Sequence, residues 1–167
     1  MTPELKPITL AGVPAALQKA ERYRLLNEPA AAESICLDVL EIDPHNQQAA
    51  VMLLLSITDR LAEDLSENVS RARAVLPRLK DDYKRMYYSG IICERRATAQ
   101  LRRGAPGAAE IAYEWLTEAM EWYERAERIR PPGNDESILR WNTCVRIISR
   151  DDHLKPRMAE RFEPSLE

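Results

Sequence analysis

The chain has 167 residues, of which 45% are hydrophobic and 31% charged, and its formal net charge is −3. This composition is typical of one water-soluble globular domain that buries its own core, and the low glycine content argues against a sheet-rich fold. No apolar run approaches the roughly 20 residues that a membrane-spanning helix needs. The first twelve residues contain Pro3, Glu4 and Pro7 and no apolar core, so they predict no secretory signal. We therefore expect a cytoplasmic protein with no membrane partner.

Three cysteines, Cys36, Cys93 and Cys144, lie far apart in the sequence. Each falls within the apolar stripe of a predicted helix, and their number is odd. A protein in the reducing cytoplasm rarely holds disulfides. These positions therefore predict three buried thiols that pack as small apolar side chains, and neither a disulfide framework nor a metal site.

Apolar residues recur at spacings of three and four along most of the chain, which predicts helices and no strands. Six main helices and a shorter seventh are expected, at residues 14–26, 29–41, 47–61, 65–79, 82–103, 108–129 and 136–148. Prolines and glycines separate them, at Pro29, Pro44, residues 104–107 and residues 131–133. Pro77 falls inside the fourth helix and is expected to kink it or end it early.

Short polar residues stand at the expected helix starts, where their side chains can accept hydrogen bonds from free backbone N–H groups. Asn27 or Glu28 would cap the second helix and Asn46 the third. Asp81 and Asp82 would cap the fifth helix, and Asp135 the seventh. The polar segment after Arg150 is expected to be loosely held, with one further turn after Pro156.

Two segments carry small, aromatic and proline residues at matching positions. Ala20, Tyr23, Ala32 and Pro44 stand at the offsets of the tetratricopeptide repeat, and so do Ala119, Tyr123, Ala126 and Pro131. The chain therefore resembles the tetratricopeptide repeat family over about residues 14–149. In such a repeat, small residues let two helices approach closely, an aromatic ring fills the gap beside them, and a proline ends the second helix.

The resemblance implies an all-α fold of antiparallel helical hairpins stacked as a short right-handed solenoid. Pro44 and Pro131 are 87 residues apart, whereas one repeat has about 34, so the third hairpin must be elongated. Gly90 is the expected small residue of its long first helix. The predicted organisation is an N-terminal arm at 1–13, a helical domain at 14–149 and a polar C-terminal tail at 150–167.

A solenoid of this family binds a peptide or a helix of a partner protein in a concave groove, lined by the first helix of each hairpin. The resemblance places Leu17, Glu21, Arg24, Leu25, Tyr87, Ile91, Glu94 and Arg95 on that surface. Some members of the family clamp a C-terminal carboxylate with lysine and asparagine, but Leu17 and Glu21 occupy the matching positions here and disfavour this mode. The alternative is that all these residues serve packing and solvation alone.

Charge is unevenly distributed: residues 1–70 carry −6, residues 71–103 carry +7, and residues 104–167 carry −4. The basic block contains Arg71, Arg73, Arg78, Arg85, Arg96, Arg102 and Arg103. Such a block is typical of a surface for nucleic acid or an acidic partner, which is the alternative function. The simpler explanation, which we favour, is that it complements the glutamates of the following helix, at positions 110, 114, 118, 121, 124 and 127.

Nothing in the sequence predicts catalysis or a cofactor. The two histidines, His45 and His153, stand in a helix connection and in the tail, and Asp151 and Asp152 beside His153 do not form a closed metal shell. Phosphate-binding and nucleophile motifs are missing.

Trp115, Trp122 and Trp141 are spaced for packing between the last two helices, with Trp122 off the core stripe. The expected function is a non-enzymatic interaction module, with self-association through the last helices as a further expectation.

Overall fold

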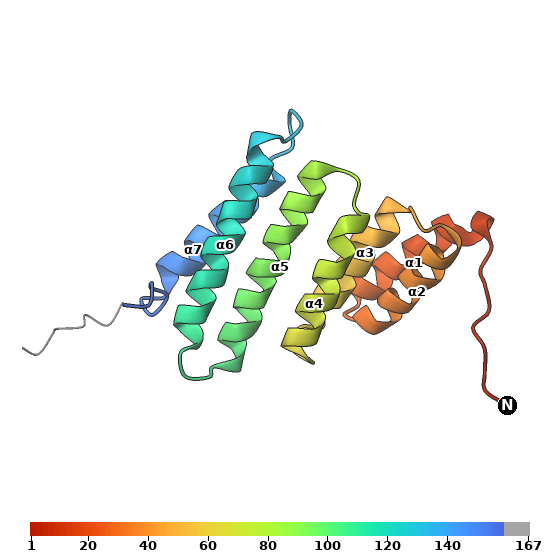
Figure 1. Cartoon of the computed structure of the whole chain (residues 1–167), viewed down its shortest axis with the longest axis horizontal. Coiled ribbons are helices and arrows are strands. Elements are labelled where there is room, and N and C mark those ends of the chain that lie inside the picture. Colours follow the sequence, from red (N-terminus) through yellow and green to blue (C-terminus); the bar gives the residue numbers. More distant parts are fainter. Residues whose placement is uncertain (159–167) are drawn as a thin grey trace, which may run out of the picture.

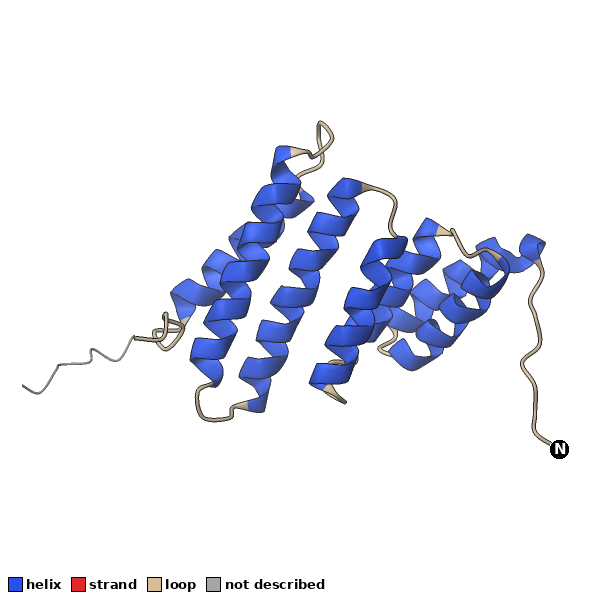
Figure 2. Cartoon of the chain, viewed as in Figure 1, coloured by secondary structure: helices blue, strands red, loops and turns tan. Residues whose placement is uncertain are grey.

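The computed structural model describes residues 1–158, and within this range the chain consists of seven α-helices and two 3₁₀ turns with no strand (Figures 1 and 2). The helices are α1 (Val13–Leu25), α2 (Pro29–Ile42), α3 (Gln47–Thr58), α4 (Leu65–Val75), α5 (Asp82–Arg103), α6 (Ala108–Arg128) and α7 (Glu136–Arg150). The 3₁₀ turns are Leu10–Gly12 and Leu76–Arg78. Each helix packs against the next one along the chain, and α1 also contacts α3. The all-α prediction is confirmed.

Local chemistry explains most helix ends. Asn46, Asp64 and Asp81 each accept a hydrogen bond from the backbone N–H three residues later, which starts α3, α4 and α5. Pro29 starts α2 in the first turn, where its missing N–H costs nothing. At Pro77 the regular helix has already ended, and the chain continues as the 3₁₀ turn, as predicted.

One predicted helix end and two predicted capping contacts are wrong. Glu28 occupies the N-cap position of α2, but its side chain makes no capping hydrogen bond, and Asn27 instead adopts the left-handed conformation (φ 59°) just after α1. The third helix stops at Thr58 instead of residue 61, since the N–H groups of Arg60 and Leu61 bond in tighter i→i−3 turns. At the start of α7, Asn134 accepts from the Glu136 N–H at 3.1 Å, while Asp135 pairs with Arg130.

The two longest helices, α5 and α6, form an extended pair. They have 22 and 21 residues, whereas the other helices have between 11 and 15. Gly104 and Gly107 both take positive φ angles, 63° and 77°, in the turn that joins the pair. The greater length expected for this third pair of helices is therefore present (Figure 1).

The buried side chains form two clusters. The first joins α1 to α4 and includes Ile92 of α5, and the second joins α5 to α7. Leu55 and Tyr88 are partly buried and pack against both clusters. Ile92, Tyr88 and Ala99 of α5 belong to or pack against the first cluster, and Arg95 of α5 also bonds to Asp59 after α3, so both apolar and polar contacts join the two halves.

Leu154 corrects part of the prediction for the C-terminal tail. Its side chain is 3% exposed and belongs to the second cluster, so the chain just after α7 is anchored to the core. The rest of the predicted tail, residues 159–167, lies outside the described residues.

Candidate functional site

Side chains from α1, α3 and α5 line two neighbouring hollows. The larger, of about 550 Å³, is bounded by Arg24, Asn27, Thr58, Asp59, Leu61, Ala62, Arg95, Thr98, Ala99, Arg102 and Arg103. The smaller, of about 320 Å³, is bounded by Glu21, Arg24, Gln48, Val51, Met52, Leu55, Lys84 and Tyr88. Arg24 borders both, so the two hollows adjoin at this side chain, and we call them together the α1/α3/α5 groove.

Asp59, at the C-terminal end of α3, holds the groove together. Its carboxylate accepts from the Arg24 guanidinium of α1 at 2.8 Å and from the Arg95 guanidinium of α5 at 2.6 Å. Arg95 also donates to the Thr58 hydroxyl at 2.6 Å and to the Leu55 carbonyl at 3.2 Å. A cation is favourable at a helix C-terminus, where carbonyl groups point outward. This junction therefore fixes three helices, far apart in sequence, in one arrangement.

The groove carries an excess of positive charge. Among residues 1–158, Asp59 is the one acidic residue that lines the larger hollow, against Arg24, Arg95, Arg102 and Arg103. Arg102 and Arg103 are exposed, and within residues 1–158 they form no ion pair. Burial lowers the pKa of the Arg95 guanidinium, and Asp59 opposes that effect. An anionic group entering the hollow would meet unpaired guanidinium groups.

The residues predicted for the groove divide into two sets. Glu21, Arg24 and Arg95 line the hollows of the α1/α3/α5 groove, and their contact with a partner stays a prediction. Leu17 and Ile91 are core residues, 4% and 2% exposed, so the prediction that they offer groove surface is wrong. Their positions face neighbouring helices rather than the open side. Leu25 is exposed but borders neither hollow.

Tyr87 and Glu94, also predicted for the groove, are buried among α5, α6 and α7. The Glu94 carboxylate accepts from the Tyr123 hydroxyl at 2.6 Å and from the Arg140 guanidinium at 3.1 Å. Burial and the nearby Glu94 charge raise the pKa of Tyr123, so its hydroxyl stays protonated and donates. Glu94 therefore ties three helices together and is not available to a partner.

The predicted basic block does not form one surface. Arg71 pairs with Glu33 of α2, Arg85 pairs with Asp82, and Arg78 donates to the Pro44 carbonyl. Arg73 and Arg96 lie over the ring of Trp115. Of the seven arginines predicted for the basic patch, Arg102 and Arg103 line the α1/α3/α5 groove. The favoured explanation also needs correction, because no ion pair within residues 1–158 joins the basic residues of α5 to the glutamates of α6.

Sequence reasoning missed the role of Glu33. It is 6% exposed on α2 and accepts from Arg60, at 2.8 Å, and from Arg71 of α4. The three carboxylates Glu33, Asp59 and Glu94 thus join successive parts of the chain. A glutamate inside the apolar stripe of α2 was the available signal, since buried carboxylates are almost always paired.

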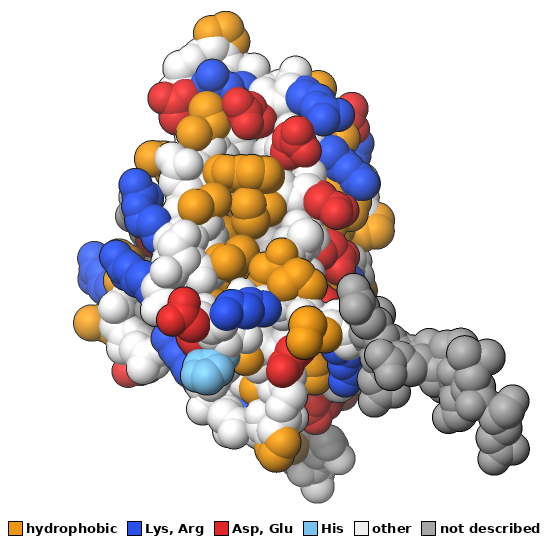
Figure 3. All heavy atoms as spheres, turned by 90° about the vertical axis from the view of Figure 1, so that its left-hand side faces the viewer, with side chains coloured by type: hydrophobic (Ala, Val, Ile, Leu, Met, Phe, Trp, Pro, Cys, Tyr) orange, Lys and Arg blue, Asp and Glu red, His pale blue; other side chains and the backbone are white. Residues whose placement is uncertain are grey.

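The tryptophans do not all lie between α6 and α7. Trp115 faces α4 and α5 instead, where Arg73 and Arg96 stack on it. Trp122 is half-buried beside Arg125, off the core stripe as expected, and Trp141 packs against the second cluster. Figure 3 shows hydrophobic side chains gathered on the α6–α7 end of the molecule, where Leu139 and Val145 are exposed. Self-association through this face stays a prediction.

All three thiols are buried, and burial raises the pKa of Cys36, Cys93 and Cys144 to about 12 each from an ordinary 9.0. Because the thiolate is the nucleophile, iodoacetamide at pH 8 is expected to alkylate the folded chain roughly a thousandfold more slowly than the chain in urea. Mass spectrometry of timed samples measures both rates. A cysteine that reacts equally fast in both states would contradict its burial.

Residues 1–158 contain no cluster of three or more histidine, cysteine or acidic side chains that could hold a metal ion. Among the described helices, none is long and apolar enough to cross a membrane. Comparisons of the chain with protein-family models, with curated proteins and with solved structures found no match.

Proposed function

We propose that the chain is a non-catalytic interaction module of tetratricopeptide-like architecture that binds an acidic segment of a partner protein in the α1/α3/α5 groove. The observation that carries the proposal is that two hollows adjoin at Arg24 and are lined mainly by α1, α3 and α5. In this arrangement α1, α3 and α5 are the first helices of three stacked pairs, and α7 follows as a terminal helix. First helices line the concave side of such a stack.

Packing at Gly90 supports the architecture. A Cβ atom built on Gly90 would lie 2.4 Å from the Tyr123 ring, so α5 and α6 approach closely where the resemblance expects a small residue opposite an aromatic one. Ala20 and Ala32 are both fully buried at the corresponding positions of α1 and α2. The second residue set, Ala119, Tyr123 and Ala126, is also fully buried.

The positive charge of the α1/α3/α5 groove favours a partner segment that carries carboxylate groups. Arginine presents a planar fork of N–H donors that matches a carboxylate in a bidentate manner. Arg102 and Arg103 extend this chemistry from the α5 end of the groove, and Lys84 adds a cation in the smaller hollow. Val51 and Leu55 give apolar surface in the smaller hollow, beside Lys84. A segment with aspartate or glutamate flanking one or two apolar residues fits this order.

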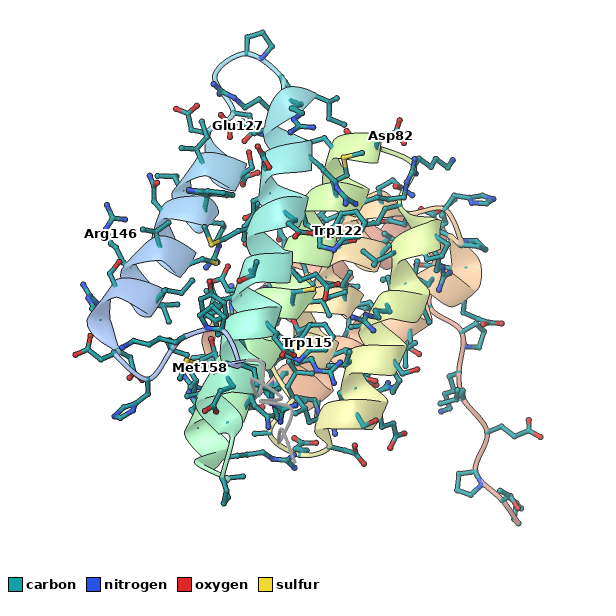
Figure 4. All side chains as sticks on the ribbon, turned by 60° about the vertical axis from the view of Figure 1, so that its left-hand side comes forward. Asp82, Trp115, Trp122, Glu127, Arg146 and Met158 are labelled. Carbon is teal, nitrogen blue, oxygen red and sulfur yellow. The ribbon has the colours of Figure 1, made fainter. Side chains whose placement is uncertain are left out.

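The test uses fluorescence anisotropy with labelled peptides that carry glutamates around a leucine. Binding is expected to weaken at least about tenfold in the double variant Arg102→Glu and Arg103→Glu, because each lost charge-assisted bond is worth about 1.5 to 3 kcal/mol. Arg146→Glu with Arg150→Glu is the matched control, since both arginines are exposed on α7 and Arg146 points away from the molecule (Figure 4). Equal weakening in both pairs, or none in either, would contradict the groove assignment.

A second experiment tests the alternative function, the binding of nucleic acid. Single-stranded RNA of the same length is titrated at 50 and 200 mM salt, since binding through many phosphates weakens steeply over this range. We expect little RNA binding, because only two arginines of the basic block are unpaired in the groove. Tight, steeply salt-dependent RNA binding together with weak peptide binding would replace the proposal by its alternative.

A further inference from the structure

A third hollow, of about 390 Å³, opens between α4, α5 and α6 on a different face of α5. It is lined by Arg73, Leu76, Ser89, Ile92, Cys93, Glu118 and Trp122. Leu76 is half-buried and provides apolar surface, the Trp122 ring comes from α6 (Figure 4), and the nearly buried side chains of Ile92 and Cys93 lie beneath them. A cavity of this size accommodates a small organic molecule.

Two guanidinium groups meet at Trp115 beside this hollow. The Cζ atom of Arg96 lies 3.8 Å from the centre of the indole ring, and that of Arg73 lies 5.4 Å from it. Arg73 also lines the hollow, and Arg96 follows Cys93 by one helical turn. A guanidinium stacked on an aromatic face is held in place, and its N–H edge remains free to donate.

No direct ion pair compensates the positive charge of Arg73 and Arg96 within the described residues, although the charge of Glu118 acts on Arg96 from a greater distance. Within residues 1–158, Arg73 and Arg96 form no ion pair, and the Arg96 Nε atom is buried without a hydrogen-bond partner. Burial, and next the charge of Arg73, lower the pKa of Arg96. Glu118 is the one acidic residue that lines the hollow, and it lies beyond ion-pairing distance of both arginines. Natural proteins seldom leave a buried hydrogen-bond donor without an acceptor, so an anion bound at this cluster would supply the missing acceptor.

We infer that the Arg73–Arg96–Trp115 cluster and the adjoining hollow bind a small organic anion, in which one carboxylate or phosphate group is carried on an apolar or aromatic body. The anionic group accepts hydrogen bonds from the two guanidinium edges. The apolar body lies against Leu76 and Trp122. The carboxylate of Glu118 repels the anion and thereby lowers its affinity for the site.

The experiment titrates the full chain with benzoate and with phenyl phosphate at constant ionic strength. Tryptophan indole N–H signals, observed by ¹H–¹⁵N NMR and assigned through single Trp→Phe variants, report the site. Saturable shifts of the Trp115 and Trp122 signals are expected, with the Trp141 signal unchanged. Comparison of the two probes distinguishes a carboxylate from a phosphate as the preferred group. Benzyl alcohol is the neutral control, and inorganic phosphate is the control without an apolar body.

Substitutions at the site should change the affinity for the two anions in opposite directions, according to the charge that each removes. Arg73→Ala and Arg96→Gln are each expected to weaken binding by about tenfold or more, and Glu118→Gln to strengthen it several-fold. Arg73 is exposed, so its variant retains the fold even if Arg96→Gln lowers stability. Arg146→Ala, on the outer side of α7, is the matched control and should leave the binding of both probes unchanged. Absence of saturable shifts, equal binding by Arg73→Ala, or equal binding of benzyl alcohol would overturn the inference.

Discussion

Replacement of Tyr123 by alanine is expected to lower the free energy of unfolding by about 4 kcal/mol, because it empties a large fully buried site. The ring fills the space against Gly90 and lies with its centre 5.9 Å from that of Tyr87. The same change deprives buried Glu94 of the hydroxyl donor at 2.6 Å. Urea unfolding followed by circular dichroism measures the loss.

Two further variants test the contribution of the Tyr123 ring: one removes only its hydroxyl group, and the other is a control at a different tyrosine. Tyr123→Phe keeps the ring and should cost about 1 to 2 kcal/mol, the usual range for one lost buried hydrogen bond. Tyr113→Ala, at a half-buried position of the same helix, is the control and should cost clearly less than Tyr123→Ala. Similar losses for Tyr113→Ala and Tyr123→Ala would show that Tyr123 is not the centre of the α5–α6 contact.

Gly90→Ala is expected to lower the free energy of unfolding by about 2 kcal/mol, although alanine favours a helix by about 1 kcal/mol over glycine. The added Cβ would lie 2.4 Å from Cε1, 2.7 Å from Cδ1 and 2.9 Å from Cζ of the Tyr123 ring. Such distances force α5 and α6 apart or move the ring. The measurement is again urea unfolding.

A double-mutant cycle that combines Gly90→Ala with Tyr123→Ala tests whether the contact with the ring causes the loss of stability. In the Tyr123→Ala background the obstructing ring is gone, so Gly90→Ala should now stabilise the chain by up to about 1 kcal/mol. A reversal of sign between the two backgrounds identifies the ring contact as the cause. The same cost in both backgrounds would mean that Gly90 is required for another reason.

The helices were predictable because their signals are local. Proline at positions 29, 44 and 77 and the capping residues Asn46 and Asp81 act within a few residues of themselves. Gly90 was predictable as the small residue of its helix because it stands in a long apolar stripe. Helix ends set by competing turns, such as that after Thr58, depend on small differences among backbone bonds and were missed.

The candidate groove was only partly predictable, because its geometry depends on partners far apart in sequence. Arg24 and Arg95 meet at Asp59, which is 35 and 36 residues away from them. Nothing local distinguishes these arginines from Arg71, which pairs with Glu33 across 38 residues. Leu17 and Ile91 were placed wrongly, since the repeat offset fixes a helical position but not how deeply neighbouring helices cover it. Trp115 was misplaced for the same reason, because a helix between two neighbours can direct a ring toward either.

The central claim is that an acidic segment of a partner binds in the α1/α3/α5 groove, and photo-crosslinking tests it most directly. A photo-reactive phenylalanine analogue is introduced at Thr98, which lines the larger hollow, and separately at Arg146 on the outer side of α7. The chain is then irradiated with the glutamate-rich peptide, and adducts are identified by mass spectrometry. We predict adducts from position 98 and almost none from position 146. Equal adducts from both positions, or adducts from position 146 alone, would contradict the claim.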